Sequence, residues 1–539
     1  PIGRTDKFFE MGGHSLLGIK ALLQIEDKLG MKLDFRVLFQ ESLADIAFRY
    51  RVLSVTPTDL APEPIAPARA TLPLVTSNEP GPALLSFSQQ RLWFLDQVEP
   101  NGAANTIAVA FEIRGTLDAR MLERALGALV ERHEALRAVF RNVEGEALQV
   151  VAKPGPLRLP MVDVSGEAFA RQRPAQLLRK ESSRGFDLAR GPLFRPQLYR
   201  LAADTHVLLL AMHHIVSDGW SIGVLFRELG ELYGGFARGE QAVLPALRIQ
   251  YRDFARWQRS WLQGEALEGL LAHWRARLAG APQVLELPTD RARPPAESHR
   301  GATYSFTLPL GLTEGLRGLG QREGATLFMT LVTGFSLLLS RYSGQQDLLV
   351  GTAVANRNHT EIENVVGLFI NTLLLRANLS GDVSARELLA RMRGVCLDAF
   401  AHQDLPFDRL VEDLRPQRDL SRNPLFQVMF ILQNAPLGTL ELQGLTLKPV
   451  EVDRGAAQVD LRLDMQETAA GLQGIFEYAT DLFDESTVAR MATHLSALLE
   501  AMVASPARRV RELPLLTDAE RRQLQVEWNA TAADYPSDA

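Results

Sequence analysis

The chain has 539 residues, more than one hydrophobic core usually holds, so we expect two to four domains. Hydrophobic residues make up 46% and charged residues 23% of the sequence, as in an ordinary soluble globular protein. The net charge of -6 is small for this length, and no basic block or lysine-rich face predicts a nucleic-acid or membrane partner. Cys396 is the single cysteine, which excludes internal disulfides and a cysteine-rich metal site.

The start of the sequence carries no secretory signal, and one cysteine suits a reducing compartment. We therefore expect a cytoplasmic protein without a metal site.

Residues 1–53 are expected to form a small helical domain. An apolar stripe with helical spacing runs from Leu16 to Ile25 and stops before Gly30. A second short helix is expected around Ile46.

Residues 54–83 are expected to be a linker, because they contain seven prolines and no aromatic residue. As a flexible coil, a segment of this length spans roughly 30 Å. The small domain is thus expected to be tethered and free to move.

The region from 84 to 514 mixes helical and strand-like patterns. We expect an α/β domain of two lobes, 84–265 and 266–514, because the region is longer than one core usually holds. Continuous apolar runs predict buried strands at residues 206–216, 347–354 and 425–432. Helical spacing predicts helices at residues 117–133, 221–239 and 326–339, the last a buried helix too short to span a bilayer. In the first helix, Leu122, Leu126 and Leu129 are expected to face the core.

Residues 515–539 are polar and lack a clear apolar stripe after Leu524. We expect them to connect to a further domain.

The most informative motif is HHIVSDG at residues 213–219, directly after the apolar run. Neighbouring strand residues point to opposite faces, so one of His213 and His214 is expected to face a substrate and the other to pack inside. An imidazole titrates near neutral pH and can accept or guide a proton. A backbone N–H near Gly219 can stabilise an oxyanion.

Each residue of this motif also has an ordinary structural role. A histidine at the end of a strand is more often structural than catalytic. Asp218 before a helix is ordinarily an N-cap, and Gly219 is ordinarily a turn residue. Taken alone, the motif leaves both interpretations open.

The motif resembles the His-His-x-x-x-Asp-Gly signature of the condensation domains of nonribosomal peptide synthetases. Six further stretches resemble the other motifs of that family, in the same order. They are SFSQQRLWFL at 86–95, RHEALR at 132–137, YRDFARWQ at 251–258, VGLFINT at 366–372, HQDLPF at 402–407 and RDLSRNPLFQ at 418–427. Ser88 stands where alanine is commoner in the family. The resemblance covers nearly all of residues 84–527.

The resemblance implies a fold of two chloramphenicol acetyltransferase-like lobes around a tunnel. It implies that His214, with Gly219 beside it, belongs to the catalytic site. His213 and Asp218 are then structural supports, and Arg357 resembles the arginine that pairs with the motif aspartate.

Three other motif residues are candidates for the tunnel wall under the same resemblance. They are Arg91, Trp93 and Asn371.

A second motif, DKFFEMGGHSLL at residues 6–17, resembles the attachment site of peptidyl carrier proteins in the same synthetases. Ser15 is also an ordinary helix N-cap, but a cap requires neither the Phe-Phe pair nor the double glycine. The resemblance implies 4′-phosphopantetheine attached covalently to Ser15, where a helix N-terminus favours a phosphodiester. Carriers of the family have a helix ahead of this loop, and too few residues precede Ser15 to form it. We therefore expect a partial carrier domain without its first helix.

His14 precedes the serine, at a position where carriers that feed an epimerisation domain more often have aspartate. No epimerisation domain separates the carrier from the condensation region. Both features favour a donor with an L or achiral terminal residue, and hence an LCL-type condensation domain.

The resemblance implies peptide-bond formation, from a carrier-bound peptidyl or aminoacyl thioester to the amine of a downstream carrier-bound aminoacyl thioester. It implies upstream and downstream synthetase modules as partners, among them an adenylation domain and an acceptor carrier protein, and a phosphopantetheinyl transferase. Residues 515–539 resemble the linker toward the adenylation domain. No nucleic acid or membrane is expected, and the chain is expected to be a monomer.

Other functions on the same fold stay open. An epimerisation domain shares the double histidine, although DGWS at 218–221 fits condensation better. A heterocyclisation domain is disfavoured, because aspartates would replace His213 and His214. A non-catalytic recruitment platform would lose those histidines. Whether His214 is a general base or a positioning group is also open.

Overall fold

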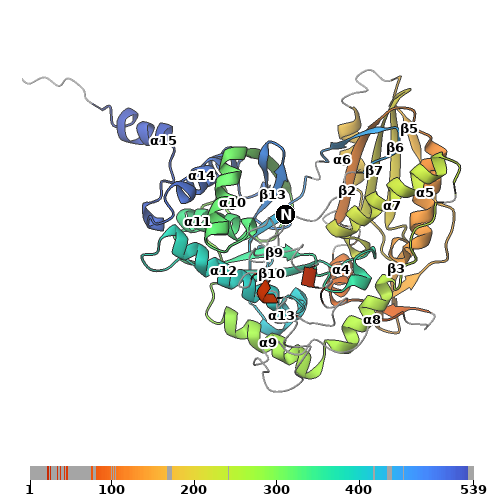
Figure 1. Ribbon diagram of the computed structural model, residues 1–539, viewed down its shortest axis with the longest axis horizontal. Coiled ribbons are helices and arrows are strands. Elements are labelled where there is room, and N and C mark those ends of the chain that lie inside the picture. Colours follow the sequence, from red (N-terminus) through yellow and green to blue (C-terminus); the bar gives the residue numbers. More distant parts are fainter. Residues whose placement is uncertain are drawn as a thin grey trace, which may run out of the picture.

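The computed structural model describes residues 74–76, 81–98, 100, 102, 105–166, 173–240, 242–416, 419–433, 440–452 and 455–531, with isolated positions between 21 and 46. Ser15, and with it the attachment motif, lies outside the described residues. So do most of the expected carrier domain and most of the proline-rich segment. The described part is dominated by two α/β lobes that stand side by side (Figure 1).

The N-terminal lobe is built on a five-stranded mixed sheet. Its strands, in spatial order, are β12 (Thr446–Val450), β2 (Thr106–Arg114), β7 (Thr205–His213), β6 (Phe194–Ala202) and β5 (Met161–Asp163). Helices α5 (Ala119–Arg132) and α7 (Gly219–Ala237) share one apolar cluster with this sheet, and α6 (Arg173–Ser182) shares another with it. Because β7 contributes residues to both clusters, it is buried on both faces, as its continuous apolar sequence predicts.

The C-terminal lobe is built on a six-stranded mixed sheet. Its strands, in spatial order, are β10 (Asn371–Asn378), β9 (Asp347–Val354), β11 (Val428–Gln433), β13 (Leu461–Thr468), β14 (Gly471–Ala479) and β8 (Gly301–Pro309). Its core helices are α10 (Leu310–Arg322), α11 (Leu327–Ser343), α12 (Ala385–Ala401) and α14 (Glu485–Ala504). One large apolar cluster joins these helices to the sheet.

The remaining elements lie around and between the lobes. A three-stranded sheet has the order β1 (Ala83–Leu84), β4 (Glu146–Val151), β3 (Ala138–Val143). The other helices are α4 (Phe87–Val98), α8 (Tyr251–Trp261), α9 (Gly264–Leu278), α13 (Phe407–Leu414) and α15 (Asp518–Arg522). Short 3-10 helices are η1 (Glu134–Arg137), η2 (His214–Val216), η3 (Thr360–Ile362) and η4 (Val510–Glu512). The element η5 (Gln523–Glu527) is a short π-helix. The chain passes from one lobe to the other through α8 and α9, near the division proposed at residue 265 (Figure 1).

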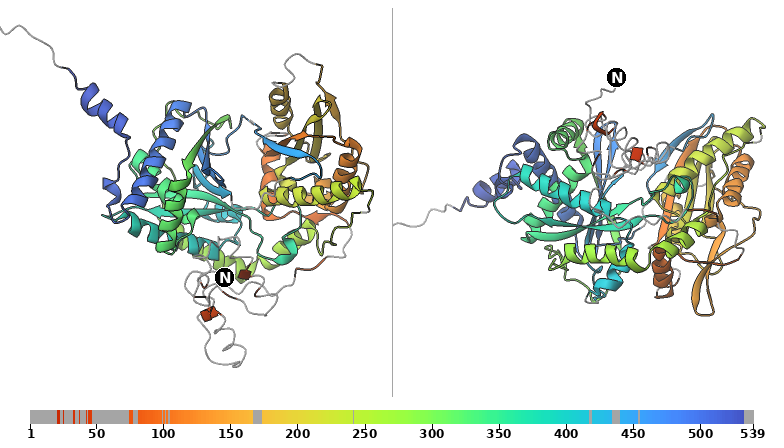
Figure 2. Two further views of the ribbon diagram at one scale, coloured as in Figure 1. Left: turned by 45° about the horizontal axis from the view of Figure 1, so that its top comes forward. Right: turned by 60° about the horizontal axis from the view of Figure 1, so that its bottom comes forward.

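Two segments of the second lobe cross into the first. Strand β12 pairs antiparallel with β2, from Thr446 opposite Arg114 to Val450 opposite Ala110, as Figure 2 also shows. The loop from 355 to 370, between β9 and β10, places Leu368 and Phe369 in a core cluster with Tyr251. The lobes are therefore interlocked, and their sequence ranges do not coincide with their sheets.

Most of the expected elements are present, and two of the expected strands are shorter than predicted. Helix α5 begins after Asp118, and its three inward leucines are fully buried. The strand predicted at 206–216 ends at His213, where the backbone enters η2. The strand predicted at 425–432 begins only at Val428, because Leu425 has a φ of 71° and forms a turn instead.

The segments expected to be plain linkers are partly packed. Leu74 is buried in a core cluster, and the Thr76 hydroxyl donates to the carbonyl of Arg248. At the other end, α15 contacts the C-terminal lobe through Nε2 of His494, 3.0 Å from an oxygen of Glu520. The assignment of 54–83 as a linker stays a prediction, but the described residues near its end contact the fold. The polar segment after 515 contains the short helix α15.

Among the described residues, no single helix is both long and apolar enough to cross a membrane. Only α10 and α11 taken together have the required length and composition, and they are bent by 105° at the break between them.

Candidate functional site

Strand β7 carries the two histidines to the junction of the lobes. It pairs with β2 along its length, ending with His213 opposite Thr106. There the backbone turns: the N–H of His214 donates to the carbonyl of Asn105 (2.8 Å), and the N–H of Ile215 donates to Nδ1 of His213 (3.1 Å). Local hydrogen bonds thus end the strand between the two histidines.

The two histidines have different environments. His213 is 2% exposed, and its ring meets that of Phe186 edge-on at 6.0 Å between centroids. Burial, with His214 beside it, lowers the pKa of His213 to about 3, so this imidazole is neutral at pH 7. His214 is partly exposed and lines a large cavity. Both histidines border the cavity, but His213 is almost completely buried and His214 is the more exposed of the two. The expected difference between them is present, although its cause is the turn from β7 into η2 and not the alternation of a continuous strand.

The cavity has a volume of about 2080 Å³ and is lined by both lobes. Its wall includes residues of the motif, of α4 and of the loop before β10, together with residues of β9, β11 and α13. Ordinary ligand pockets measure roughly 300–1,000 Å³. This cavity is large enough for two extended substrates at once.

Asp218 fixes the helix that follows the histidines. Its Oδ1 accepts from the N–H of Ser221 at 2.8 Å, which is the expected N-cap of α7. Its Oδ2 accepts from the N–H of Phe369 at 2.9 Å, across the lobe boundary. The same carboxylate lies 3.2 Å from Nη2 of Arg357, so the ion pair expected from the sequence is present.

Arg357 is buried within this junction, with 1% of its side chain exposed. Its Nη1 donates to the carbonyl of Val365 (2.7 Å) and to that of Ile362, and its Nη2 donates to Oγ of Ser221 (2.8 Å). Burial lowers the pKa of Arg357, and Asp218 opposes that shift. An arginine nevertheless stays protonated in proteins, so the pair is ionised.

Ser221 was given no role from the sequence, yet it completes this network. Its hydroxyl donates to the carbonyl of Gly367 (2.9 Å) and accepts from the N–H of Gly367 (3.1 Å). A Cβ on Gly367 would lie 1.9 Å from the ring of Tyr251, so the loop approaches that ring closely. The sequence offered a hint of this role, because Ser221 lies beside the histidine motif and Gly367 lies within another recognised motif. We call the contacts of Asp218, Ser221, Arg357, Gly367 and Phe369 the α7 joint.

Gly219 is the first residue of α7 and lines the cavity. The first N–H groups of a helix have no acceptor within the helix, and they form its positive end. No atom of another residue lies within 4 Å of the position that a Cβ on Gly219 would occupy. The arrangement offers a backbone donor to a negatively charged oxygen in the cavity.

The three tunnel candidates have different positions. Arg91 lines the cavity. Asn371 also lines it, but its amide holds the loop before α13: Nδ2 donates to the carbonyls of Gln403 (2.9 Å) and Leu405 (2.7 Å), and Oδ1 accepts from the N–H of Phe407 (3.0 Å).

Trp93 is not among the residues that line the cavity. Its side chain packs against the core cluster around Tyr251 instead. Trp93 was a tunnel or motif candidate, and the described structure supports a packing role for it on the core-facing side of α4.

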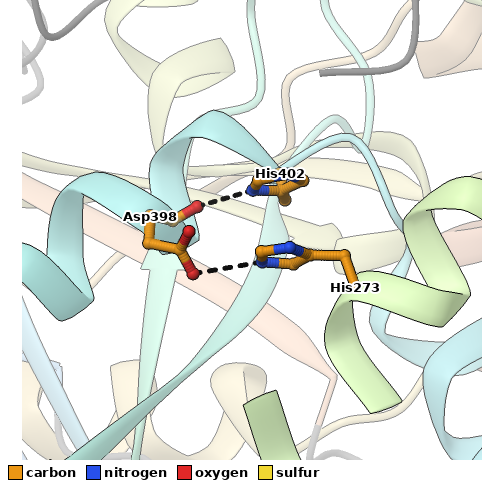
Figure 3. A group of neighbouring side chains, drawn as sticks. All are labelled: His273, Asp398 and His402. Carbon is orange, nitrogen blue, oxygen red and sulfur yellow. Dashed lines mark hydrogen bonds and ion pairs between the residues drawn. The ribbon is translucent and has the colours of Figure 1, made fainter. Parts of the chain in front are cut away.

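One group of described side chains has the composition of a metal site: His273, Asp398 and His402 (Figure 3). The two imidazole rings are stacked, with centroids 3.4 Å apart and planes 8° from parallel. Lone pairs of parallel rings do not converge on one ion. Asp398 is also engaged, 3.1 Å from Nε2 of His273 and 2.8 Å from Nε of Arg277. This arrangement is a hydrogen-bonded support between α9 and α12, and it gives no reason to assign a metal.

Comparison with protein families gives two matches. The model of the Condensation domain matches residues 81–525, and the model of the Phosphopantetheine attachment site matches residues 1–47.

Among curated proteins, a protein of the linear gramicidin synthase of Brevibacillus parabrevis is 45% identical over 99% of this chain. Malpinin synthetase of Mortierella alpina is 42% identical over 98% of this chain. The aligned part is 7% of each of these two proteins, so the chain spans a small part of their length.

Two solved structures have a similar fold. One is the X-domain in the complex of the X-domain and OxyB from teicoplanin biosynthesis, with a TM-score of 0.75 and 30% identity, covering 84% of this chain and 100% of that chain. The other is holo-AB3403, a four-domain nonribosomal peptide synthetase bound to AMP and glycine, with a TM-score of 0.75 and 27% identity. It covers 83% of this chain and 34% of that chain.

Proposed function

Because the chain belongs to the condensation domain family and has a phosphopantetheine attachment region ahead of that domain, we propose that it forms a peptide bond between two carrier-bound substrates. The position of His214 carries this proposal. It lies in the wall of a cavity of about 2080 Å³ that both lobes line, directly before a helix that the α7 joint holds in place.

The attachment region of this family carries 4′-phosphopantetheine on a serine, and we propose Ser15. The size of the cavity fits long substrate arms that enter and meet inside it. When attached, the group holds the acyl part of the substrate as a thioester, whose carbonyl carbon is open to attack by an amine.

In the proposed reaction, the amine nitrogen of the acceptor bonds to that carbonyl carbon. The carbon–sulfur bond breaks, and the nitrogen gives up a proton while the departing sulfur takes one. An α-amino group has a pKa of about 7.7 to 8.0, so a usable fraction is already neutral near pH 7. His214 therefore needs only to align the amine and receive its proton.

The remaining motif residues assist in this scheme. The N–H of Gly219 stabilises the negative charge that develops on the carbonyl oxygen, since it lies at the positive end of α7. His213 stays neutral and packs behind His214. Asp218 and Arg357 hold α7 in position through their ion pair and their bonds to the crossing loop.

We propose the domain bounds 1–53 for the carrier, 54–83 for the linker, 84–514 for the condensation domain and 515–539 for the connection to an adenylation domain. Carrier and adenylation domains are the partners that this family implies. A phosphopantetheinyl transferase that modifies Ser15, an LCL-type preference for the donor, a monomeric state and a cytoplasmic location are further proposals that rest on the sequence.

A recruitment platform is the second candidate function, because the similar X-domain was solved in a complex with OxyB. The two candidates differ in what they require of His214. A platform binds its partner without using this side chain, whereas a condensation domain needs it in the cavity. Epimerisation predicts inversion of the carrier-bound residue and no new amide.

The test is to modify the full chain with a phosphopantetheinyl transferase, load it with a defined aminoacyl group and mix it with a separately produced, aminoacyl-loaded downstream carrier. Intact-mass measurement of the downstream carrier should show one added residue. A Ser15→Ala chain should show no addition in the same mixture. A loaded chain that gives no addition with any of several aminoacyl pairs would contradict peptide-bond formation, and a change of configuration without addition would favour epimerisation.

A further inference from the structure

Within the segment 54–83, which we predict to be a linker, the described residues 74–76 are already attached to the N-terminal lobe. Leu74 is 8% exposed and belongs to a core cluster, whereas Val75 beside it is 62% exposed. The hydroxyl of Thr76 donates to the backbone carbonyl of Arg248. One apolar and one polar contact therefore hold this point of the chain. We call Leu74, Thr76 and these two contacts the linker anchor.

The core cluster that contains Leu74 also supports the reaction site. Ile215, the residue after His214, belongs to it and is fully buried. Phe369 of the α7 joint belongs to it as well. On α4, Trp93 packs against the same cluster, and other residues of this helix line the cavity. The linker anchor therefore lies on the core behind one wall of the cavity.

The polar contact of the anchor ends on a firmly held segment. Ile249, next to Arg248, is 2% exposed and lies in the same cluster. The side chain of Gln250, the N-cap of α8, donates to the carbonyl of Arg132 (3.0 Å) and accepts from the N–H of Glu134 (3.1 Å). The carbonyl that receives the anchor's hydrogen bond is therefore held between α8 and the end of α5.

The anchor sets the length of chain between the carrier and the lobe. The match to the attachment-site model ends at residue 47, so 26 residues, 48–73, separate it from the anchor. We call residues 48–73 the tether, which reaches at most about 90 Å when fully extended. Release of the anchor would add the nine residues from 74 to 82, ahead of β1. Since the local concentration of a tethered group falls roughly as the −3/2 power of tether length, this lengthening alone lowers it by less than about twofold.

Release of the anchor would also move the origin of the tether. With both contacts made, the tether starts from the core cluster that supports the histidine motif. Without them, the next described attachment is β1, which lies at the edge of the three-stranded sheet and pairs with β4 from Ala83 opposite Gln149. The fixed origin, and not the shorter length, is therefore the main effect that we expect of the anchor.

We propose that the linker anchor positions the carrier: it fixes the origin of the tether, so that the arm on Ser15 is delivered to the cavity of its own chain. Leu74 and Thr76 are positioning residues, which act through the chain that they hold. Neither of these two described residues is in the cavity wall. The proposal rests on the proposed function for the identity of the arm.

The first experiment releases the anchor in the full chain with L74A/T76V, which removes the apolar contact and the hydroxyl. Amide formation is measured with the aminoacyl group loaded on Ser15, and separately with the unmodified chain and a free aminoacyl-pantetheine thioester. We expect the tethered rate to fall at least about threefold, more than length alone explains, and the free-thioester rate to stay within about twofold of wild type. An equal fall with both donors would show that the anchor only supports the fold, and would overturn the proposal.

Two controls separate the origin of the tether from its length. Nine Gly and Ser residues inserted between residues 60 and 61 lengthen the tether by the same amount and keep the anchor, so the tethered rate should change by less than about twofold. Val75→Ala and Thr76→Ser keep both contacts and should leave the rate unchanged. A loss with the insertion as large as that with L74A/T76V would overturn the proposal.

The second experiment follows delivery of the arm without amide formation. Ala353 lines the cavity from β9, and an Ala353→Cys chain receives on Ser15 a phosphopantetheine arm whose thiol is replaced by a bromoacetamide. The new thiolate displaces bromide and bonds to the arm within one chain, at a rate independent of protein concentration. Cys396 does not compete, because it is buried and burial raises the pKa of its thiol.

We expect L74A/T76V to slow this intrachain alkylation at least about threefold, while free bromoacetyl pantetheine alkylates both chains at the same rate. Equal intrachain rates in the anchored and the released chain would contradict the proposal, even if no peptide bond is ever detected. Alkylation that depends on the anchor in a chain that forms no amide would support the anchor and count against the proposed function alone.

Discussion

Two contacts between the lobes use the same kind of ion pair in different ways. In the α7 joint, Asp218 and Arg357 are almost completely buried, and each also bonds to the backbone of the crossing loop. Between α4 and α13, in a contact that we call the α4–α13 seam, Nε of Arg91 lies 3.4 Å from Oδ1 of Asp408, and both side chains are partly exposed. The first arrangement holds one geometry, because a broken buried pair leaves an uncompensated charge. The second pair is longer and partly open to water, so it contributes less to stability. The molecule thus joins its lobes through one tightly bonded pair and one weaker pair.

Breaking the α7 joint should have the largest effect. Asp218→Ala leaves Arg357 charged and buried without its carboxylate, which typically costs about 3–5 kcal/mol. We expect the unfolding midpoint in denaturant to fall accordingly, together with activity. The exposed pair of Arg317 and Glu467 is the control, and Arg317→Ala should change the free energy of unfolding by less than about 1 kcal/mol. An Asp218→Ala chain with the midpoint of wild type but no activity would instead indicate direct chemistry for Asp218.

Overpacking the same joint should have an intermediate effect. In Gly367→Ala, the new Cβ would lie 1.9 Å from the Tyr251 ring, so the loop or the ring must move. Such overpacking typically costs about 1–3 kcal/mol. Gly394→Ala, on α12 with open space at the Cβ position, is the control and should be neutral or slightly stabilising. Equal stabilities for the two variants would show that the loop is not tightly held.

In the α4–α13 seam, Asp408 should have a small, pH-dependent effect on the free energy of unfolding. The raised pKa of Asp408 means that the folded chain holds this proton more tightly than the unfolded chain, so Asp408 makes stability fall as the pH rises from about 4 to about 6. Asp408→Asn removes that loss. The free energy of unfolding of the variant, relative to that of wild type, should therefore increase between pH 4 and pH 7. Denaturant unfolding at several pH values measures the difference.

Asp413 on the same helix provides a control of opposite sign. Its hydrogen bond and charge contact with Arg275 lower the pKa of its carboxyl, so its contribution to stability is present above the unfolded pKa and disappears as the pH falls. Asp413→Asn should therefore lose stability at pH 7 and less at pH 4. If the stability of both variants relative to wild type had the same pH dependence, the pKa values of the two carboxyls would not be shifted in opposite directions.

The residues of the fixed site could be named from the sequence, because their roles are local or carried by recognisable motifs. Asp218 precedes a helix and caps it, and the end of an apolar strand places His213 and His214 at a turn. The pairing of Asp218 with Arg357 came from the family motif alone. Ser221 could have been added, since its hydroxyl meets a glycine from another motif.

The crossing segments could not be predicted, because their contacts depend on distant partners. Strand β12 is short, exposed at most of its positions and contains a proline, and only its pairing with β2 makes it a strand. Leu74 lies in a proline-rich stretch with the composition of a coil, yet tertiary packing buries it. The position of Trp93 against the core could not be predicted for a similar reason, because a motif does not say which face of its helix meets the core.

The central claim is that His214 acts in the cavity while its neighbours hold it there. The most direct test is the single-turnover rate of amide formation by His214→Ala, with both carriers loaded and the fold checked by its unfolding midpoint. We expect the rate to fall by about 100-fold or more, the lower end of what a positioned proton acceptor contributes, with the midpoint close to that of wild type. A folded His214→Ala chain that forms the amide at the rate of wild type would contradict the account.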